Sequence, residues 1–298
     1  TKSGSSRVAA FSGGGVEKVP LVDDGVGLEE DSVRCLQGLK NTFKDPNNRL
    51  TSWSFSGDVC RLDGVSCFDD NRVIGLQLSS LELGGEIPDS LQFCKSLVTL
   101  NLSNNTLSGA IPSQICEWLP YLVNLDLSNN HLSGPVPQQL VKCKYLKNLL
   151  LSDNSLSGPL PYKLPPFVQA LNLSDNSLSG SIPSRICHWY SPIISLDLSR
   201  NRLSGQIPPE LVTCNNLKTL VLSYNHLSGP VPNQLSRFIQ GDSSMSFGNN
   251  KGLCADFEGL PSCHSTSKKH KVIMFILFDE SMDHRLMACG LWLVACGL

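Results

Sequence analysis

Cysteine is the residue type whose spacing in this chain most clearly indicates chemistry, and that chemistry is disulfide formation. The 298 residues include 12 cysteines, a number more typical of an oxidising compartment than of the cytosol. Cys60 and Cys67 form one close pair, and Cys254 and Cys263 form another. A zinc site needs more closely spaced ligands and a matching second pair nearby in the sequence. We therefore predict two disulfides in a secreted or cell-surface protein, and neither a metal nor another cofactor.

Six further cysteines remain open in their pairing. Cys94, Cys143 and Cys214 each lie eleven residues before a repeated asparagine, and Cys116 and Cys187 each lie fourteen residues before one. We expect these five to be small buried apolar groups on the convex side of the fold. Disulfides between neighbouring coils are the alternative. For Cys35, at the edge of an expected helix, a free thiol is one interpretation.

Asparagine offers a second kind of covalent chemistry. Asn101, Asn104 and Asn172 each begin an Asn-x-Ser/Thr triplet, which is the acceptor for N-linked glycans in secreted proteins. We expect glycosylation at these positions if the surface that carries them is open.

Catalytic groups that converge on one place are not recognisable. Asp126 and Asp197 occupy the same slot of a repeated phrase, as do His131 and His226. A hydrolase needs a nucleophile, a base and an orienting group that meet in one cleft, whereas repeated residues form rows along a surface. The sequence therefore predicts a protein that is not an enzyme.

The elements that position these residues come from a phrase that recurs seven times, close to Leu-x-Leu-x-x-Asn-x-Leu-x-Gly-x-Ile-Pro. Its copies begin at Leu76, Leu100, Leu125, Leu149, Leu171, Leu196 and Leu220, with spacings of 24, 25, 24, 22, 25 and 24 residues. This period predicts an α/β solenoid of about seven plant-type leucine-rich repeats, closed by N- and C-terminal disulfide caps. The net charge of -2 gives no general attraction to nucleic acid.

Each position in the phrase has a physical role. The two leucines follow the two-residue period of a strand, so both point into the core and stack on the leucines of neighbouring coils. The asparagine satisfies buried backbone groups and is expected to form a ladder. Its members are Asn105, Asn130, Asn154, Asn176, Asn201 and Asn225, whereas the first copy has Leu81 there.

The regions outside the repeats predict the domain organisation. We expect a disordered segment at 1–28, an N-terminal cap with a helix at 29–72, repeats at 73–235, a C-terminal cap at 236–263 and a tail at 264–298. In the tail, the apolar runs 272–278 and 286–298 are only 7 and 13 residues long, whereas a membrane span needs about 20. We expect a disordered or partly apolar tail that does not span a membrane, and its contact with a membrane stays open.

A longer period is also present. The stretch that begins at Ile111 recurs at Ile182, 71 residues later, which indicates that a block of three coils is duplicated. The spacing of 22 residues falls at 163–170, where two prolines are adjacent. We predict a local distortion of the solenoid there.

The quoted phrases carry a resemblance to a known family. The LSGxIP ending, with EDSVRCLQGLKNTFKDPNNRLTSWSF, CRLDGVSC, SQICEWLPYLVNLDLS and FGNNKGLC, resembles the ectodomains of plant leucine-rich repeat receptor-like kinases that interact with somatic-embryogenesis-type co-receptor kinases. The likeness covers about 29–263, and kinase motifs are absent from this chain. It implies an extracellular module that docks on the co-receptor ectodomain and modulates receptor signalling in immunity, in the negative direction.

Two columns of variable residues on the concave sheet are the expected docking surface. The candidates are Asp126 and Asp197 at the strand centres, and Asn129, Asp153, Asp175, Arg200 and Tyr224 just before the asparagine ladder. Arg and Tyr are enriched among residues that dominate binding energy. The alternatives are a secreted defence-type inhibitor that resembles polygalacturonase-inhibiting proteins, and a non-functional truncated receptor product.

Overall fold

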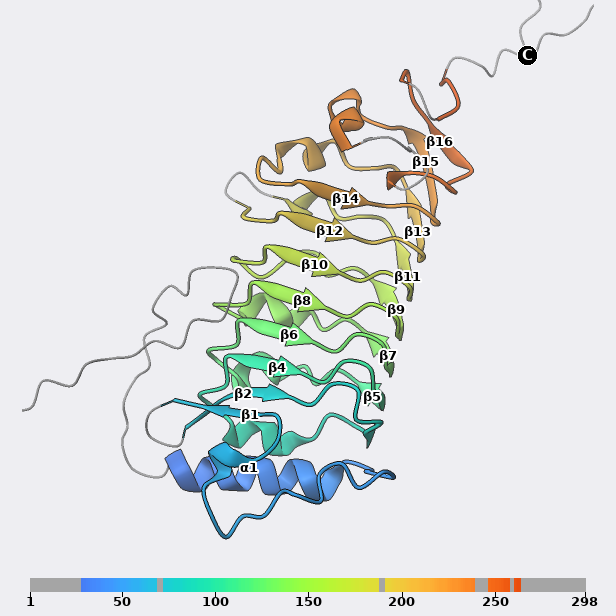
Figure 1. Ribbon diagram of the computed structural model, residues 1–298. Helices are drawn as coiled ribbons and strands as arrows, with labels where there is room; N and C mark the ends of the chain where they lie inside the picture. Colours follow the sequence, from blue (N-terminus) through green and yellow to red (C-terminus); the bar gives the residue numbers. More distant parts are fainter. Residues whose placement is uncertain (1–27, 69–71, 188–190, 239–245, 258–259, 264–298) are drawn as a thin grey trace, which may run out of the picture. The chain divides into compact units, whose positions relative to one another are not determined.

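The leucine-rich repeats stack as coils, each of which contributes one strand to each of two sheets (Figure 1). The computed structural model describes residues 28–68, 72–187, 191–238, 246–257 and 260–263. The chain divides into a unit of residues 1–263 and a unit of residues 264–298. The expected N-terminal segment and the expected tail lie outside the described residues.

The first sheet is formed by the Leu-x-Leu segments. Its strands, in spatial order, are β1 (Val65–Cys67), β2 (Val73–Gln77), β4 (Thr99–Asn101), β6 (Asn124–Asp126), β8 (Asn148–Leu150), β10 (Ala170–Asn172), β12 (Ser195–Asp197) and β14 (Thr219–Val221). β1 runs antiparallel to β2, and the other pairs are parallel. Leucine pairs with leucine at every parallel step, so the predicted leucine spine is confirmed.

A second parallel sheet follows the asparagine ladder and was not predicted from the sequence. Its strands are β3 (Gly84–Gly85), β5 (Thr106–Ala110), β7 (His131–Pro135), β9 (Ser155–Pro159), β11 (Ser177–Gly180), β13 (Arg202–Gly205), β15 (His226–Pro230) and β16 (Gly252–Cys254). The repeated glycine bends each strand away from the coil, since it adopts a positive φ that a side chain would disfavour, 79° at Gly109 for example.

Short helical turns complete most coils on the side away from the first sheet. They are α2 (Ile115–Trp118), η2 (Asp89–Phe93), η3 (Gln138–Lys142), η4 (Ser184–Ile186), η5 (Pro209–Thr213) and η6 (Asn233–Phe238), with η1 (Val59–Arg61) in the N-terminal cap. Proline precedes η2, η3, η4 and η5 as the N-cap residue, where its fixed φ suits the turn into a helix.

The predicted asparagine ladder is confirmed, and the structure gives its hydrogen bonds. The Asn105 amide nitrogen donates to the carbonyls of Leu78, Leu102 and Ser103 at 2.8–3.1 Å, and its oxygen accepts from the backbone of Leu81 and Leu83. Asn105 thus serves the first coil, which lacks an asparagine of its own.

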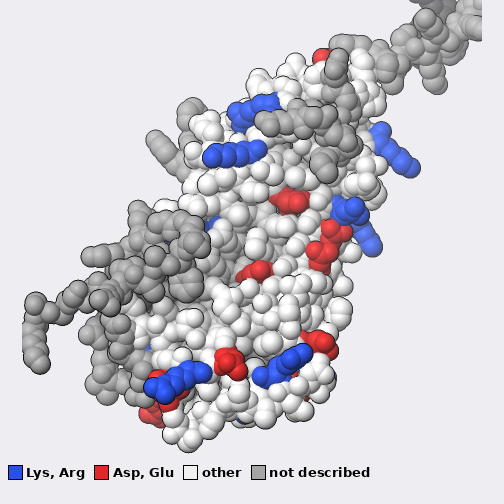
Figure 2. Space-filling model, in the orientation of Figure 1, with Lys and Arg blue, Asp and Glu red and all other residues white. Residues whose placement is uncertain are grey.

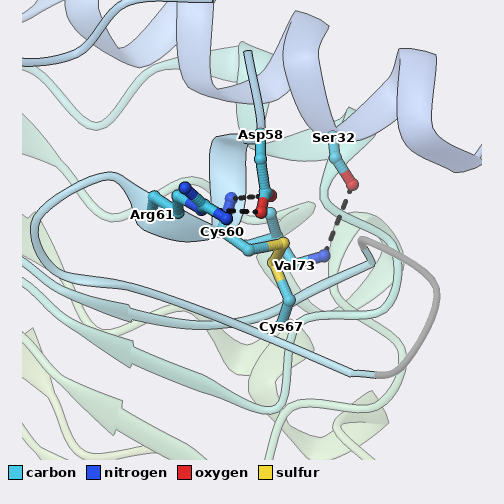
Figure 3. Close-up of a disulfide and its surroundings, with 6 residues drawn as sticks. All are labelled: Ser32, Asp58, Cys60, Arg61, Cys67 and Val73. Atoms are coloured by element: carbon cyan, nitrogen blue, oxygen red, sulfur yellow. Dashed lines mark hydrogen bonds and ion pairs between the residues drawn. A yellow bond between two sulfur atoms is a disulfide. The ribbon is translucent and has the colours of Figure 1, made fainter.

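The N-terminal cap covers one end of the leucine spine. Helix α1 (Leu28–Thr42) packs on this end, and its Ser32 hydroxyl accepts from the backbone N–H of Val73 (Figure 3). Trp53 is 1% exposed and donates its ring N–H to the Asp63 carbonyl. Close to the Ser32–Val73 contact, the predicted disulfide between Cys60 and Cys67 ties η1 to β1 (Figure 3).

The C-terminal cap continues the repeat pattern for one more coil. Asn250 extends the ladder, because its oxygen accepts from Leu227 at 3.0 Å and its nitrogen donates to Leu222, Phe247 and Gly248. The second predicted disulfide, between Cys254 and Cys263, closes this cap.

Three additional disulfides correct the expectation for the other cysteines. Cys35 is bonded to Cys94 and is not free; it ties α1 to the turn after η2. The cysteines expected as unpaired apolar groups form the bonds Cys116–Cys143 and Cys187–Cys214. Cys116 lies within α2 and Cys187 directly follows η4, and their partners Cys143 and Cys214 follow η3 and η5 on the next coil. The Cα atoms of the two pairs are 4.9 Å and 5.6 Å apart, within the range of a disulfide.

The shortened coil between β9 and β10 shows the predicted local distortion as the loss of its helical turn, but the distortion does not reach the sheets. Both sheets keep their register across it, with Leu149 opposite Leu171 and Gly158 opposite Leu178. The coil is shorter on the side away from the first sheet, where the described chain has no helical turn between β9 and β10. The missing turn leaves Tyr162 and Phe167 exposed, at 57% and 54%.

Candidate functional site

The exposed face of the first sheet carries the predicted strand column. The parallel register aligns its members across the coils: Gln77, Asn101, Asp126, Leu150, Asn172, Asp197 and Val221. This face is mostly uncharged, with separate acidic groups on it (Figure 2). It is a broad surface of mixed chemistry.

The two aspartates of this column also have a structural task. One carboxylate oxygen of Asp126 accepts from the backbone N–H of Ser128 at 3.0 Å and from its hydroxyl at 2.6 Å. Asp197 holds Ser199 in the same way, at 2.9 Å and 2.6 Å. Both aspartates are half-buried, and one oxygen of each is already hydrogen-bonded to serine. Less of each carboxylate is therefore free to bind a partner.

The residues before the ladder form a second column with an unusual backbone. Each of them has a positive φ between 51° and 57°: Asn104, Asn129, Asp153, Asp175, Arg200 and Tyr224. Only glycine, asparagine and aspartate adopt this region readily, so arginine and tyrosine are strained there. Ser80 and Asn249 extend the column at its two ends, and neither was predicted. We call the eight residues the turn column.

Side chains of neighbouring coils contact one another along this column. The amide nitrogen of Asn129 donates to the Asn104 oxygen at 2.7 Å. The Arg200 guanidinium lies 3.8 Å from the Asp175 carboxylate and 4.6 Å from the centre of the Tyr224 ring. Arg200 is therefore held between an anion and an aromatic face while its side chain stays 55% exposed.

The charges along the turn column shift the titration of one carboxyl group. Burial raises the pKa of Asp175 above its ordinary value, and the nearby negative charges of Asp153 and Asp197 raise it further. The positive charge of Arg200 opposes them and lowers the pKa, but the net shift is upward. The structure therefore brings Asp153, Asp175, Asp197 and Arg200 close enough to interact electrically.

The three predicted glycan acceptors differ in their surroundings. Asn101 and Asn172 use the side-chain oxygen to accept from the serine of their own triplet, at 2.7 Å from Ser103 and 2.8 Å from Ser174. Asn104 is exposed in the turn column. Glycosylation at the three positions stays a prediction.

The described ranges contain no cluster of three or more histidine, cysteine, aspartate or glutamate side chains that could hold a metal ion. Among the same residues, every helix is too short or too polar to cross a membrane.

Comparisons with known proteins agree with this architecture. Residues 29–68 match the leucine rich repeat N-terminal domain. The Leucine Rich Repeat family matches residues 96–118, 121–143, 167–189, 193–214 and 216–238.

Two curated relatives from Arabidopsis thaliana are inactive kinases by name. The probable inactive receptor kinase At1g27190 is 63% identical over 122 residues, and the inactive LRR receptor-like serine/threonine-protein kinase BIR2 is 56% identical over 123 residues. Each match covers 39% of this chain and 20% of the relative. The chain thus spans about a fifth of the length of the curated relatives it matches.

Solved structures of plant receptor kinases share this fold. Pollen Receptor Kinase 3 is 30% identical with a TM-score of 0.60, over 68% of this chain and 98% of that one. The Arabidopsis thaliana receptor kinase HAESA, solved with the peptide hormone IDA and the co-receptor SERK1, is 28% identical with a TM-score of 0.60, over 76% of this chain and 42% of that one.

Proposed function

The chain belongs to the leucine-rich repeat ectodomains of plant receptor-like kinases, and on that premise we propose that it is an extracellular protein-binding module that docks on the ectodomain of a co-receptor kinase. The docking surface is the turn column together with the exposed face of the first sheet. Bound there, the module keeps the co-receptor from other receptors and lowers their signalling. It acts by binding and not by catalysis.

The observation that carries the proposal is the organisation of Arg200. Its guanidinium is held by Asp175 on one coil and by Tyr224 on another, at 3.8 Å and 4.6 Å. A side chain that is fixed before binding loses less conformational entropy when a partner docks. Arginine and tyrosine are also the types that most often dominate interface energies. Arg200 and Tyr224 are therefore the expected centre of the interface.

The likeness to HAESA supports the choice of partner. That receptor kinase was solved together with the co-receptor SERK1, and its fold is the fold of this chain. The words "probable inactive" and "inactive" in the names of the two curated relatives support a module that regulates by occupying a partner.

The disulfides support an extracellular location. Five of them join ten cysteines of the described chain, and such bonds persist in oxidising compartments.

Affinity measurements on two matched arginine variants test the docking surface. The full chain, secreted from plant cells, is passed over an immobilised SERK-type co-receptor ectodomain. Arg200→Ala should weaken binding about tenfold, since it removes an interface centre. Arg202→Ala is the control, because Arg202 lies two residues away on β13 of the second sheet and is also exposed. Equal affinities for both variants would contradict the assignment of the turn column.

A second arm separates the alternatives. The same preparation is added to a fungal polygalacturonase and the rate of substrate cleavage is recorded. Inhibition without co-receptor binding would favour the defence-type inhibitor over the proposed function. If the chain shows neither binding nor inhibition, the non-functional truncated receptor product is the remaining alternative.

A further inference from the structure

A row of aromatic side chains lies at the start of the first-sheet strands, on the side opposite the turn column. Tyr121, Tyr145 and Phe167 each stand four residues before the first leucine of their repeat. The rings of Tyr121 and Tyr145 are stacked, with centres 6.1 Å apart and planes inclined by 23°. Phe167 follows on the next coil and is 54% exposed.

Backbone hydrogen bonds place these three residues in one row. Two residues after each aromatic residue, the chain bonds to the preceding coil: Lys147 donates to Val123 at 2.8 Å, and Gln169 donates to Lys147 at 2.7 Å. Neighbouring strands of a sheet are about 4.7–4.9 Å apart. The row therefore repeats one chemical group at the spacing of the coils.

The last ring of this row, Phe167, is exposed on the shortened coil, whereas Tyr121 and Tyr145 are half-buried. With no helical turn between β9 and β10, the chain passes through 160–168 in an irregular segment. Phe167 and Tyr162 of this segment are two of the five large apolar side chains that are exposed among the described residues. Exposed aromatic rings that adjoin one another on a surface offer an apolar area on which a ligand can pack.

Lysines surround the aromatic row. Lys144 and Lys147 flank Tyr145, and Lys163 stands four residues before Phe167. None of these three forms an ion pair with a described residue, whereas Lys142 on the same coil is paired with Glu117 at 2.9 Å. The row therefore carries an uncompensated positive charge that would favour an anionic partner.

Amide side chains form the edge of the row that faces the sheet. The Asn148 nitrogen donates to the Asn124 oxygen at 2.6 Å, and the Asn124 nitrogen donates to the Thr99 hydroxyl at 3.2 Å. This line of amides and a hydroxyl crosses β4, β6 and β8 beside the aromatic row. Its remaining donors and acceptors can bind the hydroxyl groups of a ligand.

We propose that Tyr121, Tyr145, Phe167, Lys144 and Lys147, here called the aromatic–lysine ridge, bind an anionic polysaccharide built of uronic acids. A sugar ring has an apolar face of C–H groups that packs on an exposed aromatic ring, hydroxyls that suit the amide row, and a carboxylate that suits a lysine. A polymer of such rings presents the three groups at a regular interval, as the coils do. The ridge lies at the start of the first-sheet strands and the turn column beyond their ends, so the polysaccharide would touch the first sheet only along the edge away from the turn column.

Binding of defined oligosaccharides tests the ridge. The full chain is titrated with polygalacturonate oligomers, a neutral β-glucan oligomer of equal length, and polyglutamate of equal charge. We expect measurable binding of the polygalacturonate alone, weakened by added salt. Equal binding of polyglutamate would show a surface for acidic proteins, and absence of polygalacturonate binding would overturn the proposal outright.

Two substitutions and a matched control locate the site. Phe167→Ala should weaken binding about fivefold, since it removes the exposed ring, and Lys147→Gln should weaken it by a similar factor. Lys218→Gln is the control, because Lys218 occupies the same row three coils beyond Lys147, where Asn216 replaces the aromatic residue. If Lys218→Gln weakened polygalacturonate binding as much as the two site variants, the effect would come from the general charge of the protein. That result would contradict the proposed site.

Circular dichroism and the melting temperature of each variant check that it remains folded. The two proposals can fail separately, because polygalacturonate binding is measured without the co-receptor. Phe167→Ala should keep its affinity for the co-receptor ectodomain, and Arg200→Ala should keep its affinity for polygalacturonate. If Phe167→Ala lost both ligands while folded, the two surfaces would not be independent and the assignment of the ridge would be wrong.

Discussion

Replacement of one ladder asparagine by alanine should destabilise the fold by about 2–3 kcal/mol, and Asn130 is the residue of choice. Its nitrogen donates to the carbonyls of Leu102, Leu127 and Ser128 at 3.0–3.2 Å, and its oxygen accepts from the N–H of Leu107 at 2.9 Å. Asn130 is only 5% exposed. Bulk water therefore does not reach the backbone groups that lose the Asn130 side chain.

The magnitude follows from which groups keep another partner. In Asn130→Ala the Leu102 carbonyl still accepts from Asn105, the Leu127 carbonyl from Asn154, and the Ser128 carbonyl from the backbone of Asn104. Only the Leu107 N–H loses its side-chain acceptor. One orphaned buried donor costs about 1–3 kcal/mol, and the weakened carbonyl contacts add a fraction of this.

Urea unfolding of the oxidised protein, followed by circular dichroism, gives the change in free energy. The control is Asn129→Gly at the adjacent exposed position, where glycine accepts the φ of 52° without strain. We expect a change of less than about 0.5 kcal/mol for this control, as for most surface substitutions. Equal changes for the two variants would refute the reasoning that the ladder, and not the turn, holds neighbouring coils together.

Three other predictions concern the turn column and the disulfides. Tyr224→Ala should weaken co-receptor binding about tenfold, measured on the same surface as Arg200→Ala, whereas an unchanged affinity would remove the ring from the interface. The pKa of Asp175 in the folded protein is raised above its ordinary value of 3.8, so ionisation of this carboxyl group destabilises the folded state. The free energy of unfolding, relative to that of Asp175→Asn, should therefore fall as the pH rises from 3.8 through the folded pKa. An NMR titration should also show that Arg200→Ala raises the Asp175 midpoint further, and a downward shift would contradict the assigned causes. Opening the Cys35–Cys94 bond by double serine substitution should cost more than opening Cys60–Cys67, about 4 against about 2.5 kcal/mol, because the bonds span 59 and 7 residues; the reverse order in urea unfolding would count against the loop-entropy explanation.

The repeats could be predicted in detail because one period fixes many residues at once. Leu76, Leu100 and the later leucines share a register in the sheet, and a strand period of two follows directly from Leu-x-Leu. The ladder could be predicted for a similar reason, since a buried amide must find partners and its neighbours stand at equal intervals.

Pairing of the central cysteines could not be predicted, because it depends on contacts between coils. Cys116 and Cys143 occupy different positions in their repeats, so the period alone does not show that they meet. The second sheet was missed because its segments mix serine, glycine and proline, which are poor strand formers. They pair only because the first sheet already fixes the spacing of the coils.

The candidate site was predicted in its positions but not in its contacts. The sequence places Asp175, Arg200 and Tyr224 on neighbouring coils, yet their distances depend on side-chain rotamers and on the positive φ of the turn. The signal that was available is the asparagine or aspartate at most of these positions, since both residues tolerate that backbone. The same signal identifies Asn249 in the C-terminal cap.

Competition for the co-receptor tests the central claim most directly. A hormone receptor ectodomain loaded with its peptide is used to capture a SERK-type co-receptor ectodomain, in the presence of increasing amounts of the full chain. The proposed function predicts that wild-type protein reduces the captured co-receptor in proportion to its own binding, and that Arg200→Ala does so only at about tenfold higher concentration. Unchanged capture at concentrations that saturate the co-receptor with this chain would contradict it.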